Sequence, residues 1–226
     1  MTVLDVRRIT RSQWGGRLSS TMAGLNARHP WSHNDHFHSW ILTRLPERPR
    51  RALDVGCGGG ELLARLAERV DEVVGIDTDA GMRAAAAARC LGAPHVHVSD
   101  IPLATIDGPF DVVTMVAVLH HLDVEAALHD VRRLLAPGGR FLCVGLAPSA
   151  SPADLAWDLA SIVTNPLIGF VKHPWPAREA PAPPPFPVAD PTLSFDELRE
   201  LANTVMPGAQ MRHQLGFRHT LEWTAP

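Results

Sequence analysis

Short apolar segments alternate with segments of helical periodicity from residue 51 to residue 146. The apolar segments read RALDV, EVVGID, HVHVSD, FDVVTMVAV and RFLCVGL, and the helical ones read ELLARLAERV, MRAAAAARC and EAALHDVRRLL. Short runs rich in β-branched residues are typical of strands that are covered on both faces. Strands that alternate with helices indicate repeated βαβ units. We therefore predict an α/β fold on a doubly wound parallel sheet, whose last helix stops at Pro137-Gly138-Gly139.

The chain of 226 residues is expected to form one domain, because single domains run to roughly 250 residues. Residues 1–48 read as an N-terminal helical cap, since HPWSHNDHFHSWILTRLP is first polar and rich in histidine and then amphipathic. Residues 49–148 form the core. Residues 149–226 hold a helical stretch, a proline-rich segment, the capped helix PTLSFDELRELANTVM and two strands around Gly216.

Prolines recur so often from Lys172 to Pro191 that neither a helix nor a central strand can persist there. An extended segment of this kind is a surface linker, a ligand for proline-binding modules through its PxxP pattern, or a lid over a binding site. We favour the lid, because the apolar side chains of Trp175 and Phe186 argue for packing.

Charge and cysteine content exclude several classes of protein. Lys and Arg number 21 against 24 Asp and Glu, so no positive excess is available to neutralise a phosphate backbone. No stretch reaches the roughly 18 apolar residues of a membrane span, and arginines stand where a signal peptide has its apolar core. The widely spaced Cys57, Cys90 and Cys143 fit reduced thiols. We expect a cytoplasmic monomer or homodimer without nucleic-acid or membrane partners.

A glycine-rich turn, DVGCGGG at residues 54–60, follows the first predicted strand and leads directly into an amphipathic helix. Glycines at this place let a ligand approach the backbone and permit a turn that side chains would block. A nicotinamide or flavin fingerprint needs a third glycine at position 61, where this chain has Glu61. The GxGxG spacing thus indicates a bound ligand that need not carry a pyrophosphate.

Acidic residues end the next two predicted strands. The carboxylate of Asp77 would lie over the crevice at the carboxyl end of the sheet, where it can accept hydrogen bonds from two ribose hydroxyls. The alternative role for Asp77, a capping or loop carboxylate, is disfavoured by its position between a β-branched strand and a helix. Asp100, or the backbone beside it, suits an adenine amino group.

The motifs LDVGCGGG, VVGIDTD, HVSDIP, FDVVTMVAVLHHL and LLAPGGRFLCVGL occur in this order. Over residues 52–146 the chain therefore resembles class I S-adenosylmethionine-dependent methyltransferases. The resemblance implies a Rossmann-like seven-stranded sheet whose last strand is antiparallel, with the two terminal strands supplying that strand and its hairpin partner. HNDHFHSWIL and RHQLGFRHTLEW are also similar to segments of small actinobacterial methyltransferases of mostly unassigned substrate.

The resemblance further implies S-adenosylmethionine as the cofactor and S-adenosylhomocysteine as the product. The residues that it places around the cofactor are Asp54, Gly56, Gly58 and Gly60 at the methionine part, Asp77 at the ribose, Thr78, Asp100 and Ile101 at the adenine, and Val116 and Ala117 beside the sulfonium.

Three histidines are candidates for work on the methyl acceptor. His36 belongs to the predicted cap, and His120 and His121 follow the fourth predicted strand. Methyl transfer from a sulfonium depends chiefly on proximity, and a base is needed only when the nucleophile must lose a proton. One of these histidines would orient or deprotonate the acceptor, and the alternative is that they only pack. Their spacing does not require a metal, and no carboxylate cluster follows the fourth strand, so we predict no metal site.

The cap and lid combine His, Trp, Phe and Pro, which favours a small aromatic or otherwise apolar acceptor of the kind met in secondary metabolism. Whether oxygen, nitrogen or carbon is methylated stays open. One alternative is a nicotinamide-dependent oxidoreductase, disfavoured by Glu61 and by the lack of a Tyr-x-x-x-Lys pair in a chain without tyrosine. The other is a protein that binds the cofactor without catalysis or uses it for non-methylating chemistry.

Overall fold

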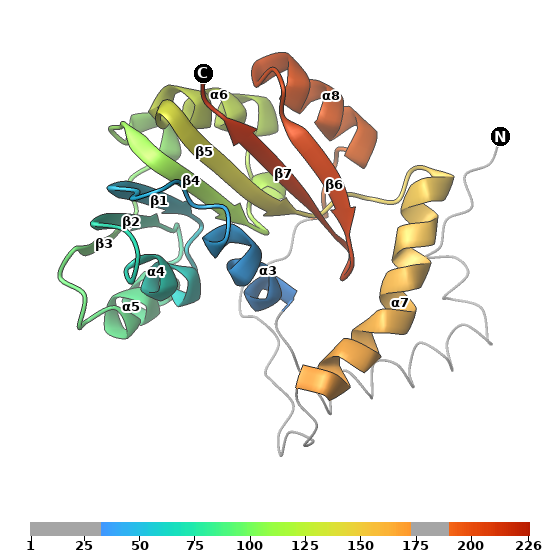
Figure 1. Cartoon of the computed structure of the whole chain (residues 1–226), viewed down its shortest axis with the longest axis horizontal. Coiled ribbons are helices and arrows are strands. Elements are labelled where there is room, and N and C mark those ends of the chain that lie inside the picture. Colours follow the sequence, from blue (N-terminus) through green and yellow to red (C-terminus); the bar gives the residue numbers. More distant parts are fainter. Residues whose placement is uncertain (1–32, 173–189) are drawn as a thin grey trace.

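The computed structural model describes residues 33–172 and 190–226 (Figure 1). The helices are α3 (His33–Leu42), α4 (Glu61–Leu66), α5 (Ala80–Arg89), α6 (Val124–Leu134), α7 (Pro152–Lys172) and α8 (Phe195–Val205), with the short 3-10 turns η1 (Leu103–Thr105) and η2 (Leu119–His121). The strands are β1 (Arg51–Val55), β2 (Glu72–Ile76), β3 (Val96–Ser99), β4 (Phe110–Val116), β5 (Leu135–Gly145), β6 (Gln210–Gln214) and β7 (Arg218–Thr224).

One seven-stranded sheet runs through the molecule in the order β3-β2-β1-β4-β5-β7-β6. The first five strands are parallel, and β1 lies between β2 and β4. The last strand, β7, is antiparallel to both β5 and its hairpin partner β6 (Figure 1). These pairings confirm the predicted Rossmann-like sheet with an antiparallel last strand. They also bring the start of β7 to the carboxyl end of β5.

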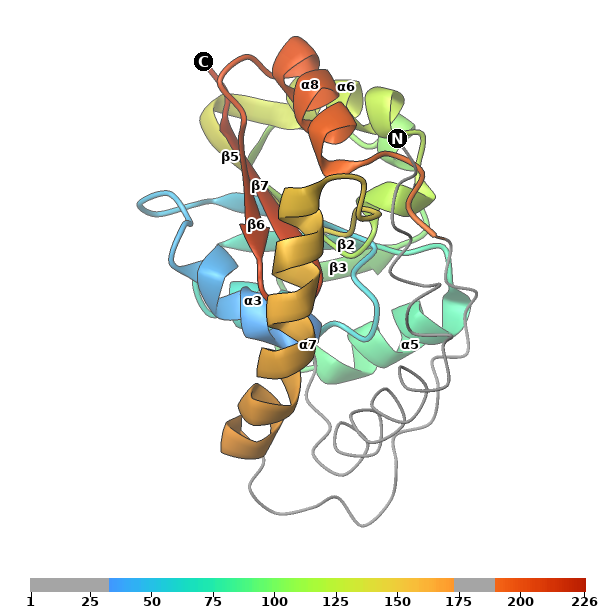
Figure 2. The same cartoon turned by 90° about the vertical axis from the view of Figure 1, so that its right-hand side faces the viewer.

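Helices cover both faces of the sheet. On one face α3, α4 and α5 bury a cluster that includes Phe37, Leu63 and Ala86. On the other face α6 and α8 bury Leu128, Leu198 and the residues around them (Figures 1 and 2). Because both faces are covered, the central strands can be apolar along their whole length. The carboxyl edge of the sheet is left as the place where functional groups can gather.

The helix ends follow from capping chemistry. Asp123 precedes α6, and its side chain accepts a hydrogen bond from the amide of Ala126 at 3.0 Å. Ser194 and Glu197 form a reciprocal capping box at the start of α8, as the SxxE pattern predicts. These caps satisfy amides that a helix N-terminus leaves without an intrahelical partner.

The boundary between α6 and β5 differs from the prediction. The helix was expected to stop at Pro137, but α6 already ends at Leu134 and β5 begins at Leu135. The Pro-Gly-Gly segment is held by the C-terminus, because the amide of Gly138 donates to the carbonyl of Ala225 at 2.9 Å and the amide of Ala225 donates to the carbonyl of Gly139 at 2.8 Å. Because of these long-range hydrogen bonds, the Pro-Gly-Gly segment forms the irregular start of β5 and does not mark the end of the helix.

The segments predicted as cap and lid are described only in part. Residues 1–32 and 173–189 lie outside the described residues. The described end of the first segment, α3, packs into the core through Phe37 and Ile41. After the core, α7 runs beside the β6–β7 hairpin (Figures 1 and 2). Within residues 33–172 and 190–226, no helix combines the length and apolar character that crossing a bilayer requires.

Candidate functional site

The glycine-rich turn lies at the carboxyl end of β1 and leads into α4. The amides of Gly56 and Cys57 both donate to the carbonyl of Ile76, at 2.7 and 3.1 Å, and these bonds tie the turn to the end of β2. Gly56, Gly58 and Gly60 all have φ in the left-handed region, at 67°, 52° and 81°. Residues with a Cβ rarely adopt this conformation, so the turn depends on glycine.

The three glycines of the GxGxG pattern leave different spaces free. A Cβ on Gly56 would lie 2.2 Å from Cγ2 of Val118, and one on Gly60 would lie 2.8 Å from Cα of Ala86. A Cβ on Gly58 would meet nothing within 4 Å. Gly56 and Gly60 therefore permit packing inside the protein, whereas the backbone of Gly58 borders open space where a ligand can approach. This geometry fits the predicted cofactor.

Asp77, at the end of β2, is held against the glycine turn. One oxygen of its carboxylate accepts a hydrogen bond from the amide of Gly58 at 2.9 Å. The other accepts a hydrogen bond from the amide of Asp79 at 2.9 Å. Each carboxylate oxygen can accept a second bond. The side chain is half-buried and follows directly after β2, at the carboxyl end of the sheet, and its role in holding a ribose stays a prediction.

Asp54 is enclosed beneath the turn. Its side chain is 3% exposed and accepts a hydrogen bond from Oγ1 of Thr114 in β4 at 2.7 Å. Burial raises the pKa of Asp54 to about 7, against the hydrogen bond from Thr114, which lowers it, and with a smaller upward contribution from Asp77. The sequence predicted Asp54 at the site but gave no signal for Thr114. From its position within the apolar strand β4, Thr114 is expected only to be buried in the core.

The predicted adenine residues lie at the ends of β2 and β3. Asp100 is largely exposed and forms an ion pair with Arg83 at 3.2 Å, and Ile101 beside it exposes 46% of its surface. Thr78 is exposed, and its carbonyl accepts a hydrogen bond from Arg83 at 2.9 Å. The same guanidinium donates to the carbonyl of Asp77 at 2.9 Å. Arg83, which the sequence did not single out, thus joins the two strand ends.

Val116 and Ala117 lie at the end of β4, as predicted. Val116 is half-buried and pairs with Val144 of β5. Ala117 has a φ of 58°, and its amide donates to the carbonyl of Val144 at 2.7 Å. A left-handed residue other than glycine is uncommon, and such residues cluster at functional sites. The chain reverses there and enters η2.

The histidines of η2 differ in their surroundings. His120 is half-buried, and its buried Nδ1 has no hydrogen-bond partner among the described residues. Burial lowers its pKa to about 4, with help from the charges of His121 and Arg218. His121 is exposed, and its ring centroid lies 4.0 Å from that of His120. The backbone of His36 belongs to α3, and its side chain lies outside the described part of the chain.

His219, near the start of β7, was missed by the sequence reasoning. It is 2% exposed and lies opposite Gly145 in the β5–β7 ladder. Burial lowers the pKa of His219 to about 3, and the nearby His213, Arg218 and His120 lower it further. The signal that could have found it is topological: in an antiparallel last strand, the first residues lie at the carboxyl edge of the parallel strands.

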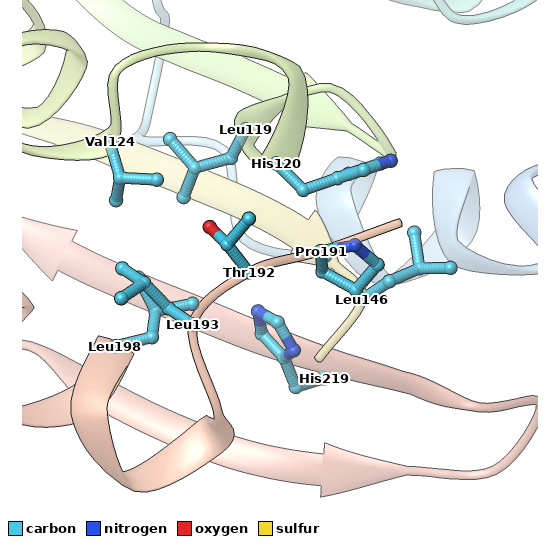
Figure 3. Close-up of a pocket in the computed structure, with 10 residues that line it drawn as sticks. Leu119, His120, Val124, Leu146, Pro191, Thr192, Leu193, Leu198 and His219 are labelled. Atoms are coloured by element: carbon cyan, nitrogen blue, oxygen red, sulfur yellow. The ribbon is translucent and has the colours of Figure 1, made fainter. Parts of the chain in front are cut away.

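A pocket lies between η2, the end of β5 and the start of β7 (Figure 3). In Figure 3, His120 and His219 approach it from opposite sides, and the segment with Pro191 and Thr192 is drawn between them. Pro191 is the last residue of the predicted lid. The pocket is lined mainly by apolar side chains: Leu119, His120, Val124, Gly145, Leu146, Pro191, Thr192, Leu193, Leu198 and His219.

The cysteines are buried and free. Burial raises the pKa of Cys57 to about 12 and that of Cys143 to about 12, and it also raises the pKa of Cys90. Thiols whose pKa is raised in this way are not ionised near neutrality, which agrees with the reduced thiols expected from the sequence. In the described part of the chain, no three His, Cys, Asp or Glu side chains gather in a way that could hold a metal ion.

The mixed sheet is that of a Rossmann-like α/β protein. Proteins of this architecture bind ligands at the carboxyl end of the sheet, where the glycine turn and the strand-end carboxylates lie here. A model of the methyltransferase domain family matches residues 53–143. An uncharacterised methyltransferase of Mycobacterium bovis is 34% identical over 200 residues, which cover 87% of this chain and 98% of that protein. The chain thus belongs to the class I S-adenosylmethionine-dependent methyltransferases. The predicted enzyme class is confirmed, and S-adenosylmethionine is the cofactor of that class.

More distant relatives cover less of the sequence or share only the fold. A demethylmenaquinone methyltransferase of Thermus thermophilus is 37% identical over 111 residues, 46% of this chain and 50% of that protein. The structure of the N-methyltransferase NodS from Bradyrhizobium japonicum with S-adenosylhomocysteine aligns with a TM-score of 0.54 at 16% identity, covering 92% of this chain and 98% of that one. Magnesium protoporphyrin IX methyltransferase from Synechocystis, also with S-adenosylhomocysteine, aligns with a TM-score of 0.55 at 16% identity and covers 98% of both chains.

Proposed function

We propose that this enzyme methylates a small, largely apolar metabolite that binds in the pocket between η2, β5 and β7. The observation that carries the proposal is the junction of that pocket with the glycine turn. Val118 packs on Gly56 of the turn, and the next two residues, Leu119 and His120, line the pocket. A ligand in the pocket would therefore lie next to the methionine end of the predicted cofactor site.

The chain's own residues would hold the cofactor along the carboxyl edge of the sheet. When bound, S-adenosylmethionine supplies an activated methyl group as an electrophile. The open backbone at Gly58 lets the ligand approach, and the second lone pairs of Asp77 are available to ribose hydroxyls. Asp100 and the exposed Ile101 offer a polar and an apolar contact for the adenine. Asp54 lies beneath the methionine part.

The pocket lining selects an apolar acceptor. Leu119, Val124, Leu193 and Leu198 contribute hydrocarbon surface, and burying such surface favours a ligand of matching apolarity. No lysine or arginine lines this pocket among the described residues. The Thermus relative is a demethylmenaquinone methyltransferase, and a quinone is an apolar ring with oxygen substituents. The likeness supports an apolar acceptor here.

His120 is the histidine best placed to orient the acceptor or take its proton. Its pKa of about 4 leaves the ring neutral at physiological pH, so one ring nitrogen can accept a proton or a hydrogen bond. The unpartnered Nδ1 is a polar atom that a bound acceptor could satisfy. A nucleophile that can attack without losing a proton would need only to be positioned by His120. The identity of the methylated atom therefore decides whether His120 acts as a base or only orients the acceptor.

The test is to follow a labelled methyl group. Purified enzyme would be incubated with methyl-labelled S-adenosylmethionine and, separately, the low-molecular-mass extract, the protein fraction and the nucleic-acid fraction of cells that carry the gene. We expect the label in the organic-soluble part of the small-molecule extract, and mass spectrometry of that product identifies the methylated atom. Label found only in protein or nucleic acid would contradict the proposal. No transfer to any fraction would favour the non-catalytic alternative.

A further inference from the structure

The antiparallel register of β7 delivers His219 to the acceptor pocket. His219 pairs with Gly145, the last residue of β5, and with His213 of β6. Both His219 and Gly145 line the same pocket as His120. In Figure 3 the ring of His219 points from β7 toward the segment that carries Pro191 and Thr192. Two strands that lie far apart in the sequence therefore build one wall of the pocket.

The imidazole of His219 is enclosed, and one of its nitrogens has no partner. The residue is 2% exposed, and Nε2 finds no hydrogen-bond partner among the residues that the structure describes. A buried polar atom left without a partner costs about 1 to 3 kcal/mol, so such atoms usually have a partner that is absent from the protein itself. A bound ligand is one such partner.

Gly145 makes room for this ring. A Cβ on Gly145 would lie 2.4 Å from Nε2 and 2.7 Å from Cε1 of His219. Such contacts are far below van der Waals distance, so any larger residue at position 145 would displace the imidazole. On another side, the ring of Phe195 meets His219 edge-on, with centroids 5.9 Å apart. The position of the imidazole is thus defined by its neighbours.

The surroundings of His219 restrict the chemistry of its partner. Its low pKa keeps the ring neutral, and the charged or chargeable groups nearby are His213 on β6, Arg218 on β7 and His120 on η2. The positive charge of Arg218, which lies close enough to lower the pKa of His219, disfavours an ammonium group beside the ring. The unpartnered nitrogen is a donor in one tautomer and an acceptor in the other, and a hydroxyl can serve either because it both donates and accepts.

We infer that His219 is an acceptor-binding residue whose Nε2 hydrogen-bonds an uncharged hydroxyl or phenol oxygen on an otherwise apolar methyl acceptor. The inference rests on the proposed function and narrows it, since it names the polar group that the substrate must carry. It adds a residue from the C-terminal hairpin to a site for which the sequence proposed the glycine turn, the strand ends and the histidines His36, His120 and His121.

The experiment compares two probes of the same shape in the presence of S-adenosylhomocysteine. Naphthol carries one hydroxyl, and methylnaphthalene carries a methyl group in its place. Affinities would be measured by titration calorimetry on the parent enzyme, on His219→Phe and on the matched control His129→Phe, which makes the same change at an exposed position of α6. S-adenosylhomocysteine binding, measured first on each protein, reports whether the variant is folded and whether the cofactor part of the proposed function holds.

We expect naphthol to bind the parent enzyme more tightly than methylnaphthalene does. His219→Phe should weaken naphthol binding about fivefold, as the loss of one neutral hydrogen bond predicts, and leave methylnaphthalene and S-adenosylhomocysteine unaffected. His129→Phe should behave like the parent. Equal affinity of the two probes for the parent enzyme, no binding of either, or naphthol affinity unchanged in His219→Phe would overturn the inference, even where S-adenosylhomocysteine still binds.

Two further variants test the position and the chemistry of the imidazole. The first, Gly145→Ala, keeps the imidazole of His219 but displaces it. Gly145→Ala should weaken naphthol binding because the new methyl group occupies the space of Nε2 and Cε1. His219→Gln, which replaces the ring with an amide that can donate and accept, should recover part of the affinity lost in His219→Phe. Naphthol binding that is insensitive to Gly145→Ala would contradict the placement of Nε2 in the binding site.

Discussion

Asp54 combines a buried carboxyl group with a hydrogen bond that it accepts from the hydroxyl of Thr114. With a pKa of about 7 in the fold against 3.8 for an ordinary aspartate, the folded protein keeps this proton over a pH range in which the unfolded chain has lost it. The unfolded state then binds fewer protons, so the free energy of unfolding falls as pH rises between these two values. Burial of the ionised carboxylate is the physical cause.

We predict that Asp54→Asn removes this decline. Urea unfolding measured at intervals from about pH 4 to about pH 8 should show a parent stability that falls by a few kcal/mol more than that of the variant over this window. Asp107→Asn, at an exposed position, serves as the control and should keep the parent slope. Parallel pH profiles for the parent and Asp54→Asn would show that the carboxyl group titrates normally.

At the acceptor side we predict that His120→Phe slows methyl transfer about a hundredfold if the acceptor must lose a proton, while S-adenosylhomocysteine affinity stays at the parent value. The exposed neighbour His121 provides the matched control His121→Phe, expected to cost far less. Because the pKa of His120 is about 4, the parent rate should persist below the ordinary range of histidine and fall only near that value. Equal rates for the parent and His120→Phe would assign the residue to packing.

Single residues were predictable where the chain itself fixes their place. Asp77 and Asp100 follow apolar runs, so their position at the carboxyl edge follows from the strands alone. His219 and Gly145 could not be paired in this way, since a shift of one residue in the β5–β7 register would turn His219 to the opposite face of the sheet. Arg83 was missed because its role depends on the distance between two strand ends.

Among the elements, α7 is joined to the hairpin by a buried serine. Oγ of Ser161 accepts hydrogen bonds from the amides of Gly216 and Phe217, at 3.1 and 3.3 Å, and the residue is fully buried. We predict that Ser161→Ala lowers the free energy of unfolding by about 1 to 3 kcal/mol, because two amides lose their partner. Urea denaturation measures it, with Ser39→Ala at an exposed position of α3 as the control. If the free energy of unfolding falls no more than in the control, the turn at Gly216 and Phe217 is stable without the hydrogen bonds to Ser161.

The existence of the elements followed from periodicity, and their ends did not always do so. The capped start of α8 was readable from Ser194 and the acidic residues after it. The end of α6 was not, because the bonds of Gly138 and Gly139 to Ala225 join segments that lie far apart in the sequence. The helical character of α3 was foreseen, but its packing through Phe37 and Ile41 depends on the neighbouring α4, whose position only the fold supplies.

For the molecule as a whole, the order of the strands determines where chemistry can occur. The order β3-β2-β1-β4-β5-β7-β6 places the ends of five parallel strands and the start of β7 along one edge. The predicted cofactor residues lie at the ends of β1, β2, β3 and β4, and the proposed acceptor pocket lies near the end of β5 and the start of β7. The motif order implied this sheet and its cofactor residues. The sequence placed His120 on the acceptor side, but it did not predict the wall formed by His219 and Gly145, because that wall comes from an antiparallel strand.

The measurement that tests the central claim most directly is calorimetric titration of the purified protein with S-adenosylhomocysteine and, separately, with NAD. We predict a micromolar dissociation constant for S-adenosylhomocysteine, within the usual range for enzyme substrates, and no measurable binding of NAD. Asp77→Ala should weaken S-adenosylhomocysteine binding by about 2 to 3 kcal/mol, through the loss of charge-assisted hydrogen bonds to the ligand. Asp71→Ala, at an exposed position, should bind like the parent. Preferential binding of NAD, or an unchanged affinity in Asp77→Ala, would contradict the account.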